Sequence, residues 1–543
     1  MGNTLPMATA ADVIFVDGIV ETVTGVTAEA VAVVGGRIVA VGSTDAVARL
    51  RTGRTEIVDL AGRALLPGLV EPHSHPDMAG FLYSWVDVSG FRHPHVADVE
   101  RVLQAAIDAA DPGEWVFAFG LDPMLTADIG VWGRDRLDAM APAVPVAVLM
   151  QSMHTLFVNS TALSRVGIDE STPQPSGGGR FGKDSTGRLT GKIEEQSAMA
   201  PFLAHALSVP TPMRDLIVDE YRTCASVGIT TMGMAGSMPG SDELCRALAD
   251  DPATPLRLVS YVGHGRALKT GRRPEFDHDR FRIAGAKLWY DGSPYTGTMY
   301  LDDPYLESNL CCCTLGIPEG SRGRPNFTPG DLLEVLRTLH ADGWQVLTHS
   351  QGDRACREMI GLYAQVLDGA DDHRWRVEHC ALISAEELHR SSEIGVSPSF
   401  HVDHIRWYGP ELVDDIIGAE RGERLMPIRT AIDAGLRPSL HADSPMYPPG
   451  PLRLASTAVN RRTRLGTTIA PHLAVTALEA LRAVTIDAAW QLGLDDEVGS
   501  IEVGKRADFA IVDRSPLRCD PLDIDQLDVE STWLDGAEVW SLS

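Results

Sequence analysis

The sequence predicts an α/β protein: a (β/α)8 TIM barrel with an insertion between barrel strands 1 and 2 and a small sheet module built from both ends of the chain. Eight short apolar segments alternate with longer amphipathic stretches in the middle of the chain. About 150 residues separate the first of these segments from the second, far more than an ordinary connection needs. Both ends of the chain are rich in β-forming residues.

The eight predicted barrel strands are mostly β-branched or aromatic runs bounded by Gly, Pro or Asp. The stretches between them, such as PGDLLEVLRTLHADG, have the apolar spacing of a helix with one buried face. The predicted strands are residues 65–75, 228–236, 256–264, 286–292, 344–350, 375–381, 395–401 and 437–444.

Turn signals divide the two β-rich ends. Asp17-Gly18 and Gly35-Gly36 interrupt the first two runs, and Asp535-Gly536 interrupts the last one, so we expect hairpins at these places. Two similar ends around a mixed middle are explained if both contribute strands to one sheet module.

Bulk composition limits the possible partners. A chain of 543 residues with 44% hydrophobic and 22% charged residues is typical of a globular protein. The net charge of -27, without a basic cluster, argues against nucleic acid as a partner. No apolar run approaches the roughly 20 residues of a membrane span. The first residues lack the pattern of a secretory signal, and the eight cysteines form no CxxC pair, so we expect a cytoplasmic protein.

Metal-ligating side chains gather where the predicted strands end. In a (β/α)8 barrel the C-terminal ends of the strands carry the catalytic groups. Each histidine alone is more often an ordinary core or surface residue than a ligand, but the set at one end of five strands indicates a site. The candidate residues are His73, His75, Lys287, His349, His379 and Asp443.

His73 and His75 are two residues apart in one strand, so both side chains point to the same side, into the barrel. Imidazole nitrogens suit Zn²⁺, Fe, Ni or Co, and the carboxylate of Asp443 completes such a donor set. The pattern predicts a divalent metal site, most simply for Zn²⁺.

Lys287 has two interpretations. Burial favours its neutral amine, which can react with carbon dioxide to give a carbamate whose two oxygens bridge two cations. Alternatively, the ammonium is paired with Asp291 or another carboxylate at the barrel mouth. The first interpretation predicts a binuclear centre, and the second is more compatible with one metal ion.

A set of motifs resembles the amidohydrolase superfamily, and within it the family 3 branch that includes N-substituted formamide deformylases. The motifs are LPGLVEPHSHP, GITT, AKLWYDGS, THSQGDRA, RVEHC, HADSP and GSIEVGKRADFAIVD. The resemblance runs from about residue 10 to the end and implies a β-sandwich from residues 1–62 and 496–543. It implies a metal-dependent barrel over residues 63–495, and we expect the inserted subdomain at residues 100–210.

The resemblance also implies functions for the candidate residues. The histidines and Asp443 would be the metal ligands, with Lys287 where a carboxylated lysine bridges two metals in many relatives. Gln351 departs from the pattern, because a second histidine often stands there. Asp443 would act as the catalytic base.

Four further residues are candidates for binding the substrate. His154 and Glu195 lie in insertion segments that resemble family segments near the site, where they would contact substrate or add a metal ligand; ordinary packing and surface charge is the alternative. His401 follows strand seven, in a place where barrel loops hold specificity residues. His441 should point the same way as Asp443 and would narrow the pocket or hydrogen-bond a ligand.

These residues predict hydrolysis of a carbon–nitrogen bond of a small molecule, in an amide, N-formyl or carbamate group, by a metal-activated water. Hydrolysis of an ester, lactone or phosphoester on the same scaffold is the alternative. A barrel without metals that serves as a scaffold is a third hypothesis, against which the complete ligand set argues. We expect a homo-oligomer, most simply a dimer.

Overall fold

The computed structural model describes residues 10–542 except 112, 131, 176–178, 208–211, 239, 275–277 and 371. The first nine residues, on which part of the expected cytoplasmic location depends, lie outside the described residues. The chain divides into two compact units, each described by itself below. One contains the chain up to Asp77 and from Val218 onward, and the other is Met78–Ile217.

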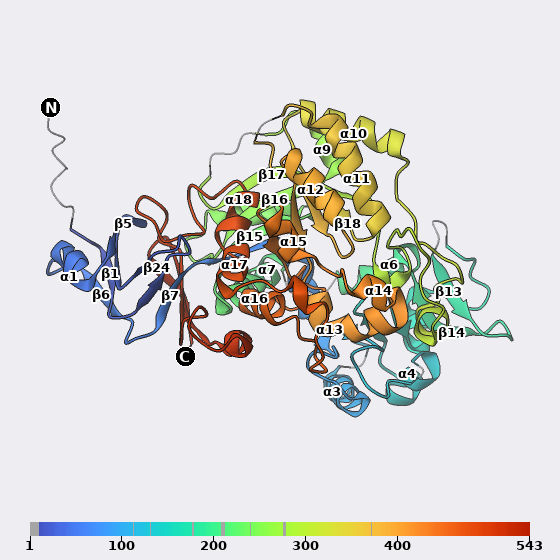
Figure 1. Ribbon diagram of the computed structural model, residues 1–543. Helices are drawn as coiled ribbons and strands as arrows, with labels where there is room; N and C mark the ends of the chain where they lie inside the picture. The colour runs from blue at the N-terminus through green and yellow to red at the C-terminus, as the bar shows by residue number, and fades with distance from the viewer. Residues whose placement is uncertain are drawn as a thin grey trace. The chain divides into compact units, whose positions relative to one another are not determined.

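The predicted barrel is confirmed: eight strands form one parallel sheet in the order β21-β20-β19-β18-β17-β16-β15-β8 (Figure 1). Seven of the predicted segments contain one strand each, and the predicted segment 286–292 overlaps only the end of β17, which begins five residues earlier, at Phe281. The strands are β8 Leu69–Ser74, β15 Ile229–Ala235, β16 Arg257–Gly263, β17 Phe281–Trp289, β18 Gln345–Ser350, β19 Arg376–His379, β20 Ser397–Phe400 and β21 Ser439–Leu440.

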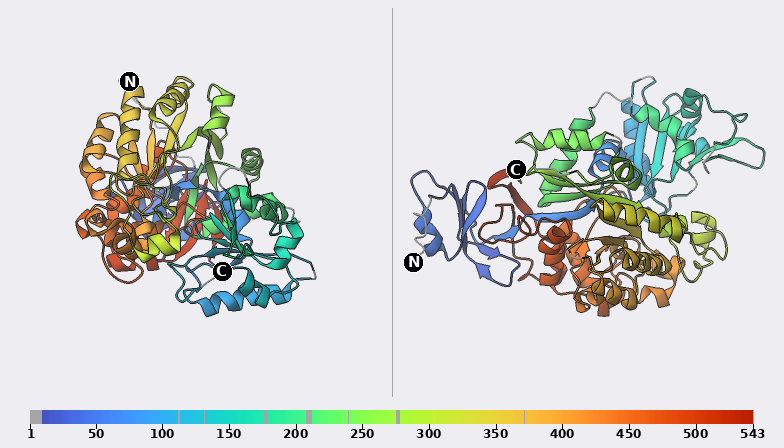
Figure 2. Two further views of the ribbon diagram at one scale, coloured as in Figure 1. Left: turned by 90° about the vertical axis from the view of Figure 1, so that its right-hand side faces the viewer. Right: turned by 90° about the horizontal axis from the view of Figure 1, so that it is seen from above.

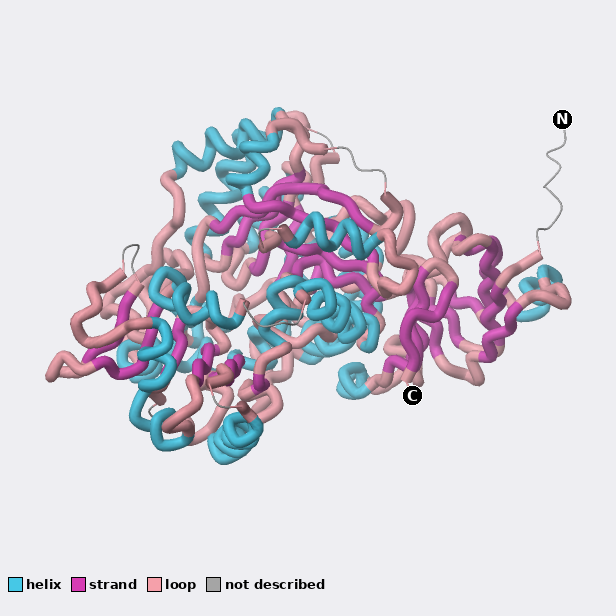
Figure 3. The backbone as a smooth tube through the Cα atoms, turned by 180° about the vertical axis from the view of Figure 1, so that it is seen from behind, coloured by secondary structure: helices cyan, strands magenta, loops and turns pink. Residues whose placement is uncertain are grey.

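Helices cover the outside of the barrel strands, and Figure 3 shows these cyan helices next to the magenta strands. They are α7 Met213–Ser226, α8 Ser241–Ala249, α9 His264–Thr270, α10 Pro329–Ala341, α11 Asp353–Val366, α12 Ala385–Glu393, α13 Asp403–Glu411, α14 Ala419–Gly422, α15 Ile428–Asp433, α16 Pro451–Asn460, α17 Ala477–Ala483 and α18 Ile486–Gln491. The π-helical segments are η3 Leu310–Leu315 and η4 Leu412–Ile417, and the 3-10 segments are η1 Ala48–Leu50, η2 Pro294–Thr296, η5 Pro471–Leu473 and η6 Pro521–Gln526.

Helix α10 illustrates why these segments are helical. Thr328 caps its first turn by accepting a hydrogen bond from the backbone N–H of Asp331, and Pro329 occupies the first helical position, where no N–H is needed. Leu332, Leu336 and Leu339 recur at helical spacing and are buried. The helix therefore presents an apolar stripe to β18 and a polar face to solvent.

The segment predicted as barrel strand 1 is divided between two sheets. Residues Ala64–Pro67 form β7 of the terminal module, and only Leu69–Ser74 belong to the barrel. The break falls at Gly68, where a Cβ atom would lie 2.1 Å from Oγ1 of Thr230, so only glycine fits. Continuous apolar residues concealed this change of sheet from the sequence.

Both ends of the chain build the terminal module, and Figure 2 shows the blue and red strands side by side. Its sheets have the orders β5-β4-β1-β6 and β24-β23-β22-β7-β2-β3. Phe15, Phe509 and Trp533 meet edge to face in the core of the module. The strands are β1 Val13–Val16, β2 Ile19–Glu21, β3 Thr27–Ala28, β4 Ala30–Val34, β5 Arg37–Gly42, β6 Glu56–Asp59, β22 Phe509–Val512, β23 Val529–Leu534 and β24 Ala537–Ser541, with helix α1 Thr44–Val47.

Two of the three expected hairpins are present. Gly35-Gly36 joins the antiparallel pair β4 and β5, and Asp535-Gly536 joins β23 and β24. The hairpin expected at Asp17-Gly18 is wrong, because β1 and β2 enter different sheets. A turn signal in the sequence predicts that the chain reverses its direction. It does not determine which strand each flanking segment pairs with in the sheet.

The unit Met78–Ile217 contains a second mixed sheet, ordered β13-β14-β12-β11-β10-β9, and the residues 100–210 expected as an insertion lie within this unit. Phe119, Leu149, Leu156 and Ile193 are buried in its core. Its elements are β9 Val86–Asp87, β10 Val116–Leu121, β11 Val146–Met150, β12 Thr155–Val158, β13 Arg180–Lys183, β14 Leu189–Glu194, α3 Val96–Ala109, α4 Arg134–Met140, α5 Ser160–Val166 and α6 Gln196–Ala206, with α2 Pro76–Tyr83 at its start.

The seam of the barrel, between β8 and β21, is closed by isolated hydrogen bonds that involve both side chains and backbone. Within the described residues these two strands share no ladder of backbone hydrogen bonds. Glu71 of β8 instead accepts hydrogen bonds from the backbone N–H of Ala442, at 3.1 and 3.3 Å. The N–H of His75 donates to the carbonyl of Ser444 at 2.9 Å. The candidate site therefore lies across the seam.

Among the described helices, none is both long and apolar enough to cross a membrane. All eight cysteines are free, and Cys311, Cys312 and Cys313 lie in η3.

Candidate metal centre

The fold brings the six candidate residues together at the C-terminal ends of the barrel strands. His73 is near the end of β8 and His75 directly follows it, while His379 is the last residue of β19. Asp443 lies three residues beyond β21, in a loop rather than on the strand on which it was predicted. The remaining two are Lys287 in β17 and His349 in β18.

Asp443 is the residue on which the histidines of the seam converge. Its Oδ1 atom lies 3.2 Å from Nε2 of His75 and 3.5 Å from Nε2 of His73. His379 and His401 approach the other carboxylate oxygen, each with its Nδ1 atom at 3.9 Å. One carboxylate thus faces four imidazoles, an arrangement that suits a divalent cation.

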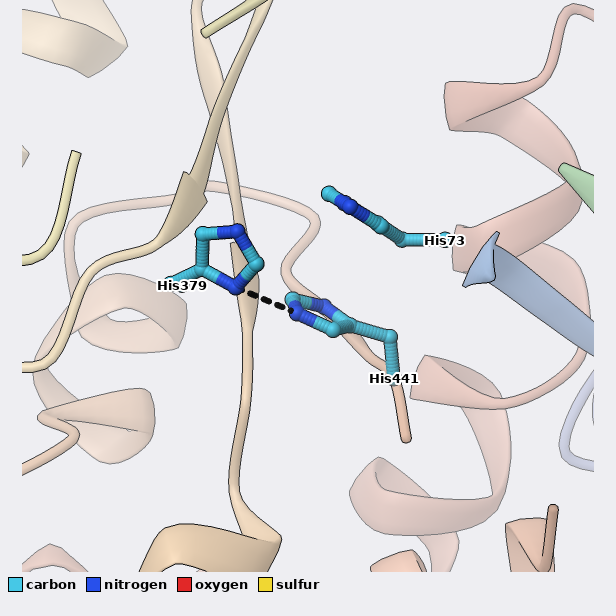
Figure 4. Close-up of side chains that lie close together, drawn as sticks. All are labelled: His73, His379 and His441. Carbon is cyan, nitrogen blue, oxygen red and sulfur yellow. Dashed lines mark hydrogen bonds between the residues drawn. The ribbon is translucent and has the colours of Figure 1, made fainter. Parts of the chain in front are cut away.

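Three groups of potential ligands have donor atoms within 4.8 Å of one another. Two of them share Asp443, one with His73 and His75 and the other with His379 and His401. The third consists of His73, His379 and His441, drawn in Figure 4. These groupings apply to the part of the chain that the structure describes.

His441, like Asp443, approaches Nδ1 of His379. Its Nε2 atom lies 3.0 Å from Nδ1 of His379 (Figure 4), and its Nδ1 atom lies 2.7 Å from Oγ of Ser399. His441 thus connects His379 to the polar interior of the barrel and restricts rotation of its ring.

Two buried imidazole nitrogens in the site, Nε2 of His349 and Nδ1 of His401, have no hydrogen-bond partner among the residues that the structure describes. The rings of His349 and His379 lie with centroids 4.2 Å apart. His401 donates through Nε2 to the carbonyl of Ala442 at 3.0 Å, which leaves Nδ1 as a bare lone pair. Unsatisfied buried nitrogens are costly unless a cation or a donor group meets them. The residues present therefore fit a metal ion.

The site holds its buried histidines His73, His349 and His379 neutral and its aspartate ionised. Burial, and then the charge of Lys287, lower the pKa of His349 to about 3 and that of His73 well below its usual range. Burial, followed by neighbouring histidines, lowers the pKa of His379 in the same direction. Burial opposes ionisation of Asp443, but His73 and His75 outweigh it and hold its pKa well below the usual range. Neutral imidazole and carboxylate are the forms that bind metals.

Lys287 is completely buried, and its Nζ atom lies 3.0 Å from Nε2 of His73. Burial lowers the pKa of its amine to about 8. Within the described residues Lys287 forms no ion pair with Asp291, whose carboxylate accepts the backbone N–H groups of Tyr300, Gln351 and Gly352. The geometry thus places the amine among the histidines, not against that carboxylate.

The backbone is strained at two of these residues. His379 and Asp443 have φ angles of 73° and 57°, in the left-handed region that residues other than glycine rarely adopt. Such strain persists only where the surrounding structure holds it, and it is concentrated at functional sites.

Sequence reasoning missed three charged residues around the site. Glu378 lies within hydrogen-bond distance of Nδ1 of His73, and Arg376 donates to Glu378. Glu71 accepts the N–H of His73 as well as that of Ala442. A signal was present: Arg376 and Glu378 alternate in the short apolar segment RVEH, so both point to the same side of a buried strand.

His154 and Glu195 are brought together in the unit Met78–Ile217. Nδ1 of His154 lies 3.1 Å from Oε2 of Glu195, and both side chains are about half exposed, at 47% and 50%. Glu195 has a left-handed backbone, with φ 65°. Their contact with substrate stays a prediction.

An eight-stranded parallel barrel with a histidine and aspartate cluster at the C-terminal strand ends defines a metal-dependent hydrolase of the barrel type. The chain belongs to the amidohydrolase family (Amidohydro_3), which matches residues 56–540. It is therefore an enzyme that acts on carbon–nitrogen bonds other than peptide bonds, in small molecules.

Individual relatives agree with this family. The N-substituted formamide deformylase of Arthrobacter pascens is 28% identical over 530 residues, which cover 94% of both chains. A putative amidohydrolase of Bacillus subtilis (strain 168), YtcJ, is 23% identical over 90% of this chain and 91% of its own. An uncharacterized metal-dependent hydrolase from Pyrococcus horikoshii OT3 shares the fold, with a TM-score of 0.73 and 21% identity over 94% of this chain and 99% of that chain.

Proposed function

We propose that the protein hydrolyses an amide, N-formyl or carbamate bond of a small molecule at a zinc centre with one or two ions. The observation that carries this proposal is the convergence of four imidazoles on Asp443, with two buried nitrogens that lack partners. The similarity to an N-substituted formamide deformylase supports the choice of bond.

Six residues would hold the metal: His73, His75, Lys287, His349, His379 and Asp443. When bound, a divalent cation would lower the pKa of water at the site to roughly 7 and polarise the carbonyl of the substrate. Carboxylated Lys287 would bridge two ions, whereas its free amine would correspond to one.

Asp443 would be the general base. Its carboxylate is ionised because its pKa is held well below the usual range, and its side chain keeps 18% exposure. It takes a proton from water as the oxygen adds to the carbonyl carbon, and gives it to the nitrogen as the carbon–nitrogen bond breaks. The hydroxyl group of water thus ends on the carbonyl carbon and its proton on the nitrogen. An amide therefore gives a carboxylic acid and an amine.

His401 and His441 would fix the substrate. The bare Nδ1 atom of His401 can accept a hydrogen bond from a substrate N–H group, because its Nε2 atom already donates to Ala442. His441 is fully buried and lies against His379. Both residues favour a substrate with a small group next to its carbonyl carbon, which is the atom that water attacks.

A substrate screen tests the proposed function. The purified chain, reconstituted with Zn²⁺, Co²⁺ or Mn²⁺, is assayed on N-formyl amines, N-acyl amines and carbamates, and in parallel on esters, lactones and phosphoesters. We expect turnover of the carbon–nitrogen substrates to exceed that of the oxygen esters. Turnover confined to esters, lactones or phosphoesters would contradict the proposal, and metal-free, inactive protein after reconstitution would favour a scaffold.

The state of assembly is also a proposal. We propose a homodimer that binds neither nucleic acid nor membranes and functions in the cytoplasm. Light scattering coupled to gel filtration measures the mass of the particle, and a monomer would contradict the dimer.

A further inference from the structure

The buried carboxylate of Glu378 contacts His73, the first histidine of the site. Glu378 lies one residue before His379 on β19, and its Oε2 atom is within hydrogen-bond distance of Nδ1 of His73. Both side chains have 0% exposure. Because β19 and β8 are not neighbours in the sheet, this contact crosses the interior of the barrel.

The contact defines which nitrogen of His73 carries the proton. A carboxylate only accepts hydrogen bonds, and a neutral imidazole has a single N–H, so that N–H is on Nδ1. Nε2 is then a lone pair directed into the site, 3.0 Å from Nζ of Lys287 and 3.5 Å from Oδ1 of Asp443. The contact of Nε2 with the amine of Lys287, a donor, agrees with this tautomer. The carboxylate of Asp443 cannot donate to Nε2, so its proximity adds nothing to the assignment.

Arg376 holds Glu378 in this position. Its Nε atom donates to Oε1 of Glu378 at 2.7 Å and one terminal nitrogen donates to Oε2 at 3.1 Å. The same terminal nitrogen donates to the carbonyl of Pro72, the residue before His73, at 3.1 Å. Arg376 thus fixes the carboxylate and the backbone of β8 together.

A contribution to stability does not by itself explain the buried ion pair of Glu378 and Arg376. Two charges removed from water lose hydration that their mutual attraction only partly returns, so apolar residues of the same volume often do as well. By contrast, a carboxylate that receives the second N–H of a metal-binding histidine orients the ring and strengthens the ligand.

We propose that Glu378, held by Arg376, is a positioning residue that fixes the tautomer and orientation of His73 for metal binding. This inference rests on the proposed metal site. Loss of such a partner typically weakens metal affinity or activity about 10- to 100-fold. We therefore expect Glu378→Gln to weaken Zn²⁺ binding by about that factor, since the amide replaces a charged acceptor of the same shape by a neutral group.

The buried pair Arg257 and Asp508 supplies a matched control. Its two side chains are each 2% exposed and lie 3.1 Å apart. Among the described residues, the other side-chain hydrogen bonds of this pair go to Asp279 and Asp535, not to the site. Asp508→Asn should lower thermal stability without changing Zn²⁺ affinity. Zn²⁺ affinity is measured on wild type, Glu378→Gln and Asp508→Asn by competition with a chromophoric chelator. Absorption spectra of the Co²⁺ forms report the ligand field, and thermal unfolding reports stability.

Weaker Zn²⁺ binding and a shifted Co²⁺ spectrum in Glu378→Gln alone would support the inference. Equal affinity of Glu378→Gln and wild type would overturn it while leaving the proposed metal site intact. Failure of the wild type to bind Zn²⁺ would overturn both. If Glu378→Gln does not fold, ¹⁵N NMR of the wild type determines which nitrogen of His73 carries the proton. The signals of His73 are identified by comparison with the spectrum of His73→Asn. A proton on Nδ1 of His73 supports the inference, and one on Nε2 overturns it.

Discussion

The amine of Lys287 and Nε2 of His73 lie 3.0 Å apart, both buried in the barrel. The pKa of the amine is lowered to about 8 because it is desolvated. A lysine with that pKa has a substantial neutral fraction near pH 8, and only the neutral amine reacts with carbon dioxide. Its position beside a nitrogen that we propose as a metal ligand is compatible with a carbamate that bridges two ions.

Carboxylation of Lys287 predicts a change in mass and in metal content. We expect native mass spectrometry of the metal-loaded protein to show the added mass of one carbon dioxide, lost in Lys287→Ala. That variant should lose half or more of the bound metal, because the bridge between the ions is removed. Lys269→Ala, at an exposed position of α9, is the control and should keep all the metal. Unchanged metal content in Lys287→Ala would contradict the bridge.

Asp443→Asn tests the general base. The amide cannot accept the proton of water, so we expect kcat to fall by a factor of about 10² to 10⁴ while metal content stays largely intact. Metal analysis and steady-state kinetics on the same preparation separate the two effects. An active variant would remove Asp443 from the proton transfer, and a variant without metal would make it chiefly a ligand.

His401→Phe tests the predicted substrate contact. Phenylalanine keeps an aromatic ring at this position but removes the bare Nδ1 atom, together with the Nε2–H that donates to Ala442. We expect KM to rise by about 10-fold, equivalent to roughly 1.4 kcal/mol for one hydrogen bond, with metal content unchanged. Loss of metal instead would place His401 among the ligands, as its proximity to His379 and Asp443 allows.

The neutral histidines predict an acid-sensitive apoprotein. The folded-state pKa of His349, about 3, lies below its ordinary value of 6.5, so the unfolded chain binds the proton more readily between these values. The stability due to this group is complete above pH 6.5 and is lost as the pH falls toward 3. The expected slope is about 1.4 kcal/mol per pH unit for each such histidine.

Urea unfolding of the metal-free protein between about pH 6 and about pH 4.5 measures this slope. His349→Gln should show a shallower dependence than the wild type, because one of the groups that resists protonation is gone. Parallel curves for the two proteins would show that His349 does not contribute to acid sensitivity.

Local pattern predicted the barrel, because strands and helices of a (β/α)8 fold each have their own apolar period. It also predicted that His73 and His75 share a face, since alternation along a strand is local geometry. The partner of β2 and the division at Gly68 depend on distant segments, which no local pattern records. Glu378 was missed for the same reason, because its importance comes from contact with His73, 305 positions away in the chain.

The seam described above has a mechanical consequence. His73 belongs to the first strand of the barrel, His75 directly follows that strand, and Asp443 follows the last strand. A cation held by all three would therefore join the two sides of the seam, where the described strands share no ladder of backbone hydrogen bonds. Metal binding would then be coupled to closure of the barrel between β8 and β21. Part of the free energy of metal binding would then stabilise the closed barrel. The metal-loaded, active form of the enzyme would be more rigid than the metal-free form.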